Sequence, residues 1–200
     1  MSTLLFYHFS DLHFRVKDEF DRKVVLNALW SDVRDQMKFG HVPDFVAVTG
    51  DIAFSGQVDE YKRAEEEFFI PLLDITNLQR CDLFIIPGNH DVDLSILKDL
   101  NASRISSLQD RDQVNDFISQ SRTLARYLAP FEAYHSFVSK LCGLNDSINI
   151  SYCRFVDRKV PRVAIIGLNT AWTSGYDLPQ RNPTEQGGLI VGERQILDAP

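Results

Sequence analysis

Three short motifs hold most of the residues in this sequence that could do chemistry. They bring together carboxylates, imidazoles and an amide: Asp11-Leu12-His13, Gly50-Asp51 and Gly88-Asn89-His90-Asp91. Each motif directly follows or closes an apolar run typical of a buried parallel strand, at residues 4–9, 45–49 and 83–87. Because ligands collect beyond the carboxyl ends of the strands in open α/β sheets, we expect these side chains to converge on a metal site.

The residue types suit two neighbouring cations. Two residues apart on an extended chain, Asp11 and His13 would point to the same side and bind one metal. The two carboxylate oxygens of Asp51 suit a bridging ligand, and Gly50 would let the backbone pass close to that centre. Asn89 would offer an amide oxygen to the second metal. A mixed set of Asp, His and Asn favours manganese, iron or zinc over calcium.

His90 is the remaining titratable group of the cluster, and the adjacent carboxylate of Asp91 would hold its imidazole in one tautomer. Two metals roughly 3.5–4 Å apart can orient a phosphoryl group, generate a hydroxide nucleophile and neutralise developing charge. A pair of metals held by this cluster would suit the hydrolysis of a phosphoester.

The elements that must position these motifs alternate between strands and helices. Apolar residues recur at helical spacing between residues 24 and 37, and Gly40 is well placed to end that helix. A second helical pattern runs over residues 61–75, with Pro71 expected to break or kink it near Ile70. The β-α-β-α-β order predicts a parallel sheet with right-handed crossovers, in which the first run, residues 4–9, fits a central strand.

The character of the chain changes after Asp91. Residues 92–147 carry no convincing strand pattern, and we interpret them as a helical insertion or cap, interrupted at Pro130. Such a segment can wall a substrate pocket, or it can simply pack on the sheet. Two more strands are expected at residues 148–156 and 162–168, the second fully buried. A loop over 173–188 and a helix start at 192–197 follow.

Composition limits the class of protein. The 200 residues are 44% hydrophobic and 24% charged, as expected for one domain. The net charge of −7, without a Lys/Arg stripe, argues against a long nucleic acid as partner. There is no apolar run that could cross a bilayer, and the first residues lack the pattern of a secretory signal, so we expect neither such a signal nor a membrane partner. The three cysteines are widely spaced, which favours reduced thiols and a cytoplasmic location.

In company, the three motifs resemble the pattern D-x-H … G-D … G-N-H-D of the calcineurin-like metallophosphoesterase superfamily. Short elements around them look closest to its bacterial, cyclic-nucleotide-phosphodiesterase-like branch. The resemblance implies that Asp11 and His13 bind the first metal, that Asp51 bridges and that Asn89 binds the second. It also implies that His90 contacts the phosphate and assists the leaving oxygen.

As a whole, the resemblance implies an α/β fold, a metallophosphoesterase-type β-sandwich flanked by helices, over residues 1–200. It also implies metal-dependent hydrolysis of a phosphodiester or phosphomonoester, nucleotides among them, with two divalent or trivalent metal ions as cofactors.

The family pattern continues with further histidines that this sequence lacks. The sequence has five histidines, and none lies beyond His135. We interpret His8, within the first strand, as structural. His41 and His135 match no ligand motif. We interpret the chain as the N-terminal part of a longer domain, completed by a C-terminal region of the parent protein. The alternatives are a catalytically impaired metal-binding module for regulation or protein interaction, and a nuclease of the same superfamily.

Overall fold

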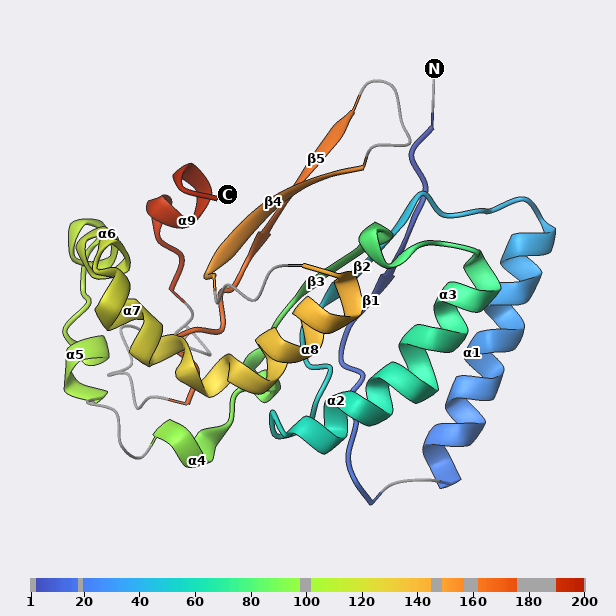
Figure 1. Ribbon diagram of the computed structural model, residues 1–200, viewed down its shortest axis with the longest axis horizontal. Coiled ribbons are helices and arrows are strands. Elements are labelled where there is room, and N and C mark those ends of the chain that lie inside the picture. The colour runs from blue at the N-terminus through green and yellow to red at the C-terminus, as the bar shows by residue number, and fades with distance from the viewer. Residues whose placement is uncertain are drawn as a thin grey trace.

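A parallel sheet forms the centre of the computed structural model, which describes residues 3–17, 20–97, 102–144, 149–156, 162–175 and 190–199. Its strands are β1 (Phe6–Phe9), β2 (Phe45–Thr49) and β3 (Leu83–Ile86), paired in the order β1-β2-β3. All three run the same way, so the loops that follow them lie at one edge of the sheet (Figure 1). The predicted mixed α/β fold with a parallel sheet is confirmed.

The position expected for the first strand is wrong. Within the described residues, β2 lies in the centre and β1 lies at the edge. Side chains of β1 alternate between exposed and half-buried, whereas most of those of β2 and β3 are buried. The aromatic residues of β1 form an apolar run in the sequence, but the strand is not covered on both faces. Phe6, for example, is exposed although its ring stacks on Phe45.

The crossover from β1 to β2 is α1 (Phe20–Lys38), which ends as predicted near Gly40, a residue with φ of 84°. One side of α1 is buried through Leu26, Trp30 and Val33. The Trp30 ring lies 5.4 Å from that of Phe68, so α1 packs beside the second crossover (Figure 1). This aromatic layer covers one face of the sheet.

The crossover from β2 to β3 is continuously helical from Val58 to Thr76, with a change of pitch in its middle. It consists of α2 (Val58–Ala64), a π-helical segment η1 (Glu65–Phe69) and α3 (Ile70–Thr76). Pro71, predicted to break or kink the helix near Ile70, cannot donate to the carbonyl of Glu67. The wider π turn accommodates that missing bond, so the helix changes pitch instead of stopping.

The described part of residues 92–147 is helical, as predicted. Its elements are α4 (Leu94–Leu97), α5 (Ala102–Ser106), α6 (Arg111–Ser119), α7 (Ser121–Leu128), η4 (Ala129–Phe131) and α8 (Glu132–Cys142). Pro130 lies in the 3-10 turn that separates α7 from α8. The last helix packs on the sheet, because the Tyr134 hydroxyl donates to the Ile85 carbonyl at 3.0 Å. Residues 98–101 and 145–147 lie outside the described residues.

A separate antiparallel pair, β4 (Ser151–Val156) and β5 (Val163–Leu168), lies against the parallel sheet (Figure 1). Phe45, Phe84 and Val156 form a small apolar cluster between the two sheets. The expectation that residues 162–168 are fully buried is wrong, because exposed and half-buried side chains alternate along most of β5 and Ile166 is 46% exposed.

The chain continues to α9 (Glu193–Leu197), the helix start that the sequence predicts. It packs against α6. Most of the loop expected over 173–188 lies outside the described residues. Short 3-10 turns, η2 (Arg80–Asp82) and η3 (Asn89–Asp91), flank β3. Among the described helices, none combines the length and apolar character that crossing a membrane requires.

Candidate metal centre

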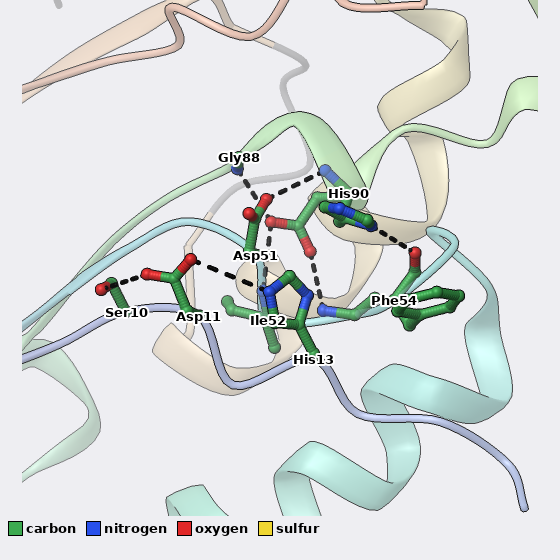
Figure 2. A network of polar contacts seen from close by, with 10 residues as sticks. Ser10, Asp11, His13, Asp51, Ile52, Phe54, Gly88 and His90 are labelled. Atoms are coloured by element: carbon green, nitrogen blue, oxygen red, sulfur yellow. Dashed lines mark hydrogen bonds and ion pairs between the residues drawn. The ribbon is translucent and has the colours of Figure 1, made fainter.

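The loops after β1 and β2 run side by side and bring the first two motifs together. The Asp11 amide donates to the Gly50 carbonyl at 3.2 Å, and the His13 amide donates to the Asp51 carbonyl at 2.8 Å. One residue further on, Phe14 pairs with Ala53 in an isolated parallel bridge. The backbone itself therefore fixes the relative positions of Asp11, His13 and Asp51 (Figure 2).

Three of the predicted ligands have left-handed backbone. The φ angles are 57° at Asp11, 47° at His13 and 54° at Asp51. The argument that Asp11 and His13 share one side of an extended chain is therefore wrong, although both do lie at the strand end. Asp and His tolerate this region better than most residues, and such conformations cluster at functional sites.

Glycines let the second and third loops approach each other. Gly50 has φ of 99°, and a Cβ placed on it would lie 2.7 Å from the Cα of Gly88. A Cβ on Gly88 would lie 2.1 Å from Oδ1 of Asp51. The close approach predicted at Gly50 is confirmed, and its neighbour is the Gly88 backbone. Any side chain at Gly88 would displace the Asp51 carboxylate.

The three loops bring His13, Asp51 and His90 together. Each offers one ligand atom, and these atoms all lie within 4.8 Å of one another. The two imidazole rings meet nearly at right angles, with centroids 4.7 Å apart. Nδ1 of His13 is buried and has no hydrogen-bond partner within the part of the chain that the structure describes, which is the state of a nitrogen that a metal would occupy. A carboxylate with two imidazoles is a donor set that fits a transition metal.

The other two predicted ligands border this group. The side chain of Asp11 is 68% exposed; its Oδ1 lies 3.8 Å from Nε2 of His13, and its Oδ2 accepts from the Ser10 hydroxyl. Asn89 is exposed and begins η3, the turn that also carries His90. Their part in metal binding stays a prediction.

The imidazole of His90 is oriented by a backbone carbonyl. Its Nδ1 lies 2.8 Å from the carbonyl oxygen of Phe54 (Figure 2). Because that oxygen can only accept, Nδ1 carries the proton, and Nε2 is the nitrogen left for a ligand or substrate. The hypothesis that Asp91 holds this imidazole is wrong. Phe54 was missed because a carbonyl partner leaves no signature in residue type.

Asp91 is fully buried and ties two site loops together. It accepts hydrogen bonds from the amides of Ala53 at 2.9 Å, Ile52 at 3.3 Å and Gly88 at 2.9 Å. The Tyr61 hydroxyl adds a fourth donor at 3.0 Å. Burial raises the pKa of Asp91 and these donors lower it, with burial the larger effect. Asp91 thus acts on the backbone of the second and third motifs.

Tyr61 is the other residue that sequence reasoning missed. The helical pattern over residues 61–75 indicates only an apolar position there. The Tyr61 ring does stack on that of Phe137, with centroids 5.1 Å apart. Burial, and then the nearby Asp91 carboxylate, raise the pKa of Tyr61, so its hydroxyl stays a donor. A tyrosine at a buried helix position, near a motif rich in carboxylates, was the available signal.

Comparison with known proteins agrees with this geometry. A family model described as calcineurin-like phosphoesterase matches residues 4–176. The chain is 27% identical over 118 residues to the uncharacterized metallophosphoesterase-like protein YydB of Bacillus subtilis (strain 168), covering 59% of this chain and 24% of that protein.

Over 90 residues it is 34% identical to the glycerophosphodiester phosphodiesterase GpdQ of Enterobacter lignolyticus (strain SCF1), covering 44% of this chain and 30% of that protein. The chain therefore spans about a quarter to a third of the length of these curated relatives.

Proposed function

This chain belongs to the calcineurin-like phosphoesterase family, and from that premise we propose that it hydrolyses a phosphoester at the site built by His13, Asp51 and His90. The observation that carries the proposal is the meeting of these three side chains from three separate strand ends. The unpartnered, buried Nδ1 of His13 supports a metal there.

The family resemblance supplies the residue roles in this proposal, and the meeting of His13, Asp51 and His90 supports them. Asp11 and His13 would hold the first metal, Asp51 would bridge, and Asn89 would hold the second. When bound, such metals orient the phosphoryl group and supply the nucleophile. Manganese, iron and zinc suit these ligands best.

His90 has a separate task in this proposal. The Phe54 carbonyl fixes the proton on Nδ1, so Nε2 is the atom that faces the phosphate. When protonated, Nε2 donates to a phosphate oxygen and passes its proton to the departing oxygen. The rival role, a metal ligand, is supported by the membership of His90 in the ligand group.

We favour a phosphodiester as substrate. One relative is named a glycerophosphodiester phosphodiesterase, and the other is named metallophosphoesterase-like without a substrate. The acidic balance of this chain, −7, supports a small ester over a long nucleic acid.

The test is hydrolysis of bis-p-nitrophenyl phosphate by the full-length protein, stripped of metal and reloaded with Mn²⁺, Fe²⁺ or Zn²⁺. We expect p-nitrophenol release only after metal is restored. Metal binding without hydrolysis under all three conditions would support a regulatory or interaction module and contradict an enzyme.

A further inference from the structure

An exposed arginine lies at the rim of the metal group. Arg15 follows His13 by two residues, and its guanidinium carbon lies 3.5 Å from the centre of the Phe54 ring. That ring lies 5.2 Å from the His90 ring and 6.2 Å from the His13 ring. The Phe54 ring thus lies close to the Arg15 guanidinium and to both imidazoles. Two anionic groups of one small molecule can span the separation between the guanidinium and the imidazoles.

The backbone that carries Arg15 is held in place by two other arginines. Nη1 of Arg63, on α2, donates to the carbonyls of Arg15 at 3.0 Å and Val16 at 2.7 Å. Nη1 of Arg22, on α1, donates to the same Arg15 carbonyl at 3.2 Å. Glu67 offsets the charge of Arg63 through an ion pair at 2.9 Å. The segment that carries Arg15 is thus tied to α1 and α2.

We propose that Arg15, stacked on Phe54, forms a subsite for a second anionic group of the substrate, a phosphate or a carboxylate carried by the phosphoester. The inference rests on the proposed function, because the metal group binds the phosphate that is cleaved and Arg15 binds the second anionic group of the same molecule. A guanidinium binds phosphate or carboxylate through two parallel hydrogen bonds, and stacking on an aromatic face orients it for that role.

The test uses two esters with the same leaving group. Thymidine 5′-(p-nitrophenyl phosphate) carries one phosphate, and its 3′-phosphorylated derivative carries a second. For the Mn²⁺-loaded full-length protein, we expect kcat/KM to be about tenfold higher for the derivative, as one charged hydrogen-bonded pair provides. Arg15→Gln should bring that ratio close to one, and Arg15→Lys should retain part of it.

Arg162→Gln is the matched control. Arg162 also stacks on a phenylalanine, with its guanidinium carbon 4.3 Å from the centre of the ring of Phe155, which lies in β4. Arg162→Gln should leave the ratio of kcat/KM between the two esters as in the wild type. Circular dichroism checks that each variant is folded. An unchanged ratio in Arg15→Gln, or a wild-type ratio of one, overturns the subsite.

A binding measurement separates this inference from the proposed function. Calorimetry compares the affinity of thymidine 3′,5′-bisphosphate with that of thymidine 5′-phosphate. We expect a preference for the bisphosphate that Arg15→Gln removes. If neither ester is hydrolysed, but the wild type prefers the bisphosphate and Arg15→Gln does not, the subsite is supported and the proposed hydrolase function is wrong. If neither nucleotide binds, or both bind equally to the wild type, the subsite is wrong.

Discussion

At the scale of single residues, the site is governed by where protons lie on two imidazoles. Nδ1 of His90 donates to the Phe54 carbonyl, whereas Nδ1 of His13 is buried and has no partner among the described residues. Nε2 of His90 is thus the nitrogen left for a substrate, and Nδ1 of His13 is a buried nitrogen that a metal would satisfy. This asymmetry leads us to assign His13 to the metal and His90 to the substrate.

His90→Ala should therefore lower turnover while leaving metal content nearly intact. A proton donor that acts in the transition state contributes about 10²–10⁴-fold, and kcat should fall more than KM. Steady-state kinetics with elemental analysis checks this, with His41→Ala, a change in an exposed loop, as control. Loss of metal together with activity, restored by excess metal, would make His90 a ligand.

Asp51→Asn should behave differently, because it removes a charge from the centre of the ligand group. We expect metal content and activity to fall together, since an amide is a weaker ligand than a carboxylate. Elemental analysis and hydrolysis are measured on the same samples. Asp35→Asn, which breaks only a surface pair with Lys38, is the control. Full metal content in Asp51→Asn would contradict the assignment.

At the scale of elements, the site depends on how helices hold the loops at the strand ends. Helix α2 reaches the site through Tyr61, whose hydroxyl donates to the carboxylate of Asp91. Helix α8 reaches the sheet through Tyr134, whose hydroxyl donates to a strand carbonyl. The two tyrosines make similar contacts with acceptors of different charge, which allows a matched comparison.

Tyr61→Phe should lower the free energy of unfolding by about 1.5–3 kcal/mol, because a hydrogen bond to a charged group is lost in a buried site. Tyr134→Phe loses a bond to a neutral carbonyl and should cost about 0.5–1.5 kcal/mol. Urea denaturation measures both. Equal losses would mean that Asp91 is uncharged in the folded protein.

Helix α8 also carries a half-buried histidine that should make stability depend on pH. Burial lowers the pKa of His135 from 6.5 to about 4, and its buried Nε2 has no hydrogen-bond partner among the described residues. The folded state therefore favours the neutral ring, so its contribution to stability is complete above pH 6.5 and is lost as pH falls towards 4. The loss is at most about 3 kcal/mol. Denaturation between pH 4 and 7 should show a weaker dependence for His135→Gln than for the wild type.

At the scale of the whole molecule, the side chain of Arg154 links the two sheets by direct hydrogen bonds. Arg154 of β4 donates from Nη1 to the Leu83 carbonyl at 2.7 Å and from Nη2 to the Cys81 carbonyl. Its guanidinium carbon lies 4.8 Å from the centre of the Phe84 ring. The contact lies where β3 begins, beside the apolar cluster between the sheets.

Arg154→Met should lower the free energy of unfolding by about 1.5–3 kcal/mol, because it keeps the aliphatic stem and leaves two carbonyls without their charged donor. Thermal and urea denaturation measure the loss. Arg111→Met, which breaks a surface pair with Glu193, should change stability by less than about 1 kcal/mol. Similar small losses in both variants would mean that the hydrogen bonds of Arg154 contribute little to joining the sheets.

Sequence patterns predicted the parts of this molecule in which residue type determines position. Strand ends followed by Asp and His predicted where the candidate ligand group lies, and Gly40 and Pro130 marked the ends of helices as expected. The left-handed turns at Asp11 and His13 were not predictable, because these residues adopt that backbone only when neighbouring loops impose it. The exposure of β5 was missed because an apolar run does not show which of its faces is covered.

The hydrogen bonds to Asp91 keep the loops of the site ordered before a ligand arrives. The amides of Ile52, Ala53 and Gly88 belong to no helix or strand, yet all three donate to this one buried carboxylate. The two loops should therefore open together, and only when the buried carboxylate is exposed to water. A metal would meet ligands that are already ordered, so little conformational entropy is lost on binding and affinity is set mainly by the ligand atoms themselves.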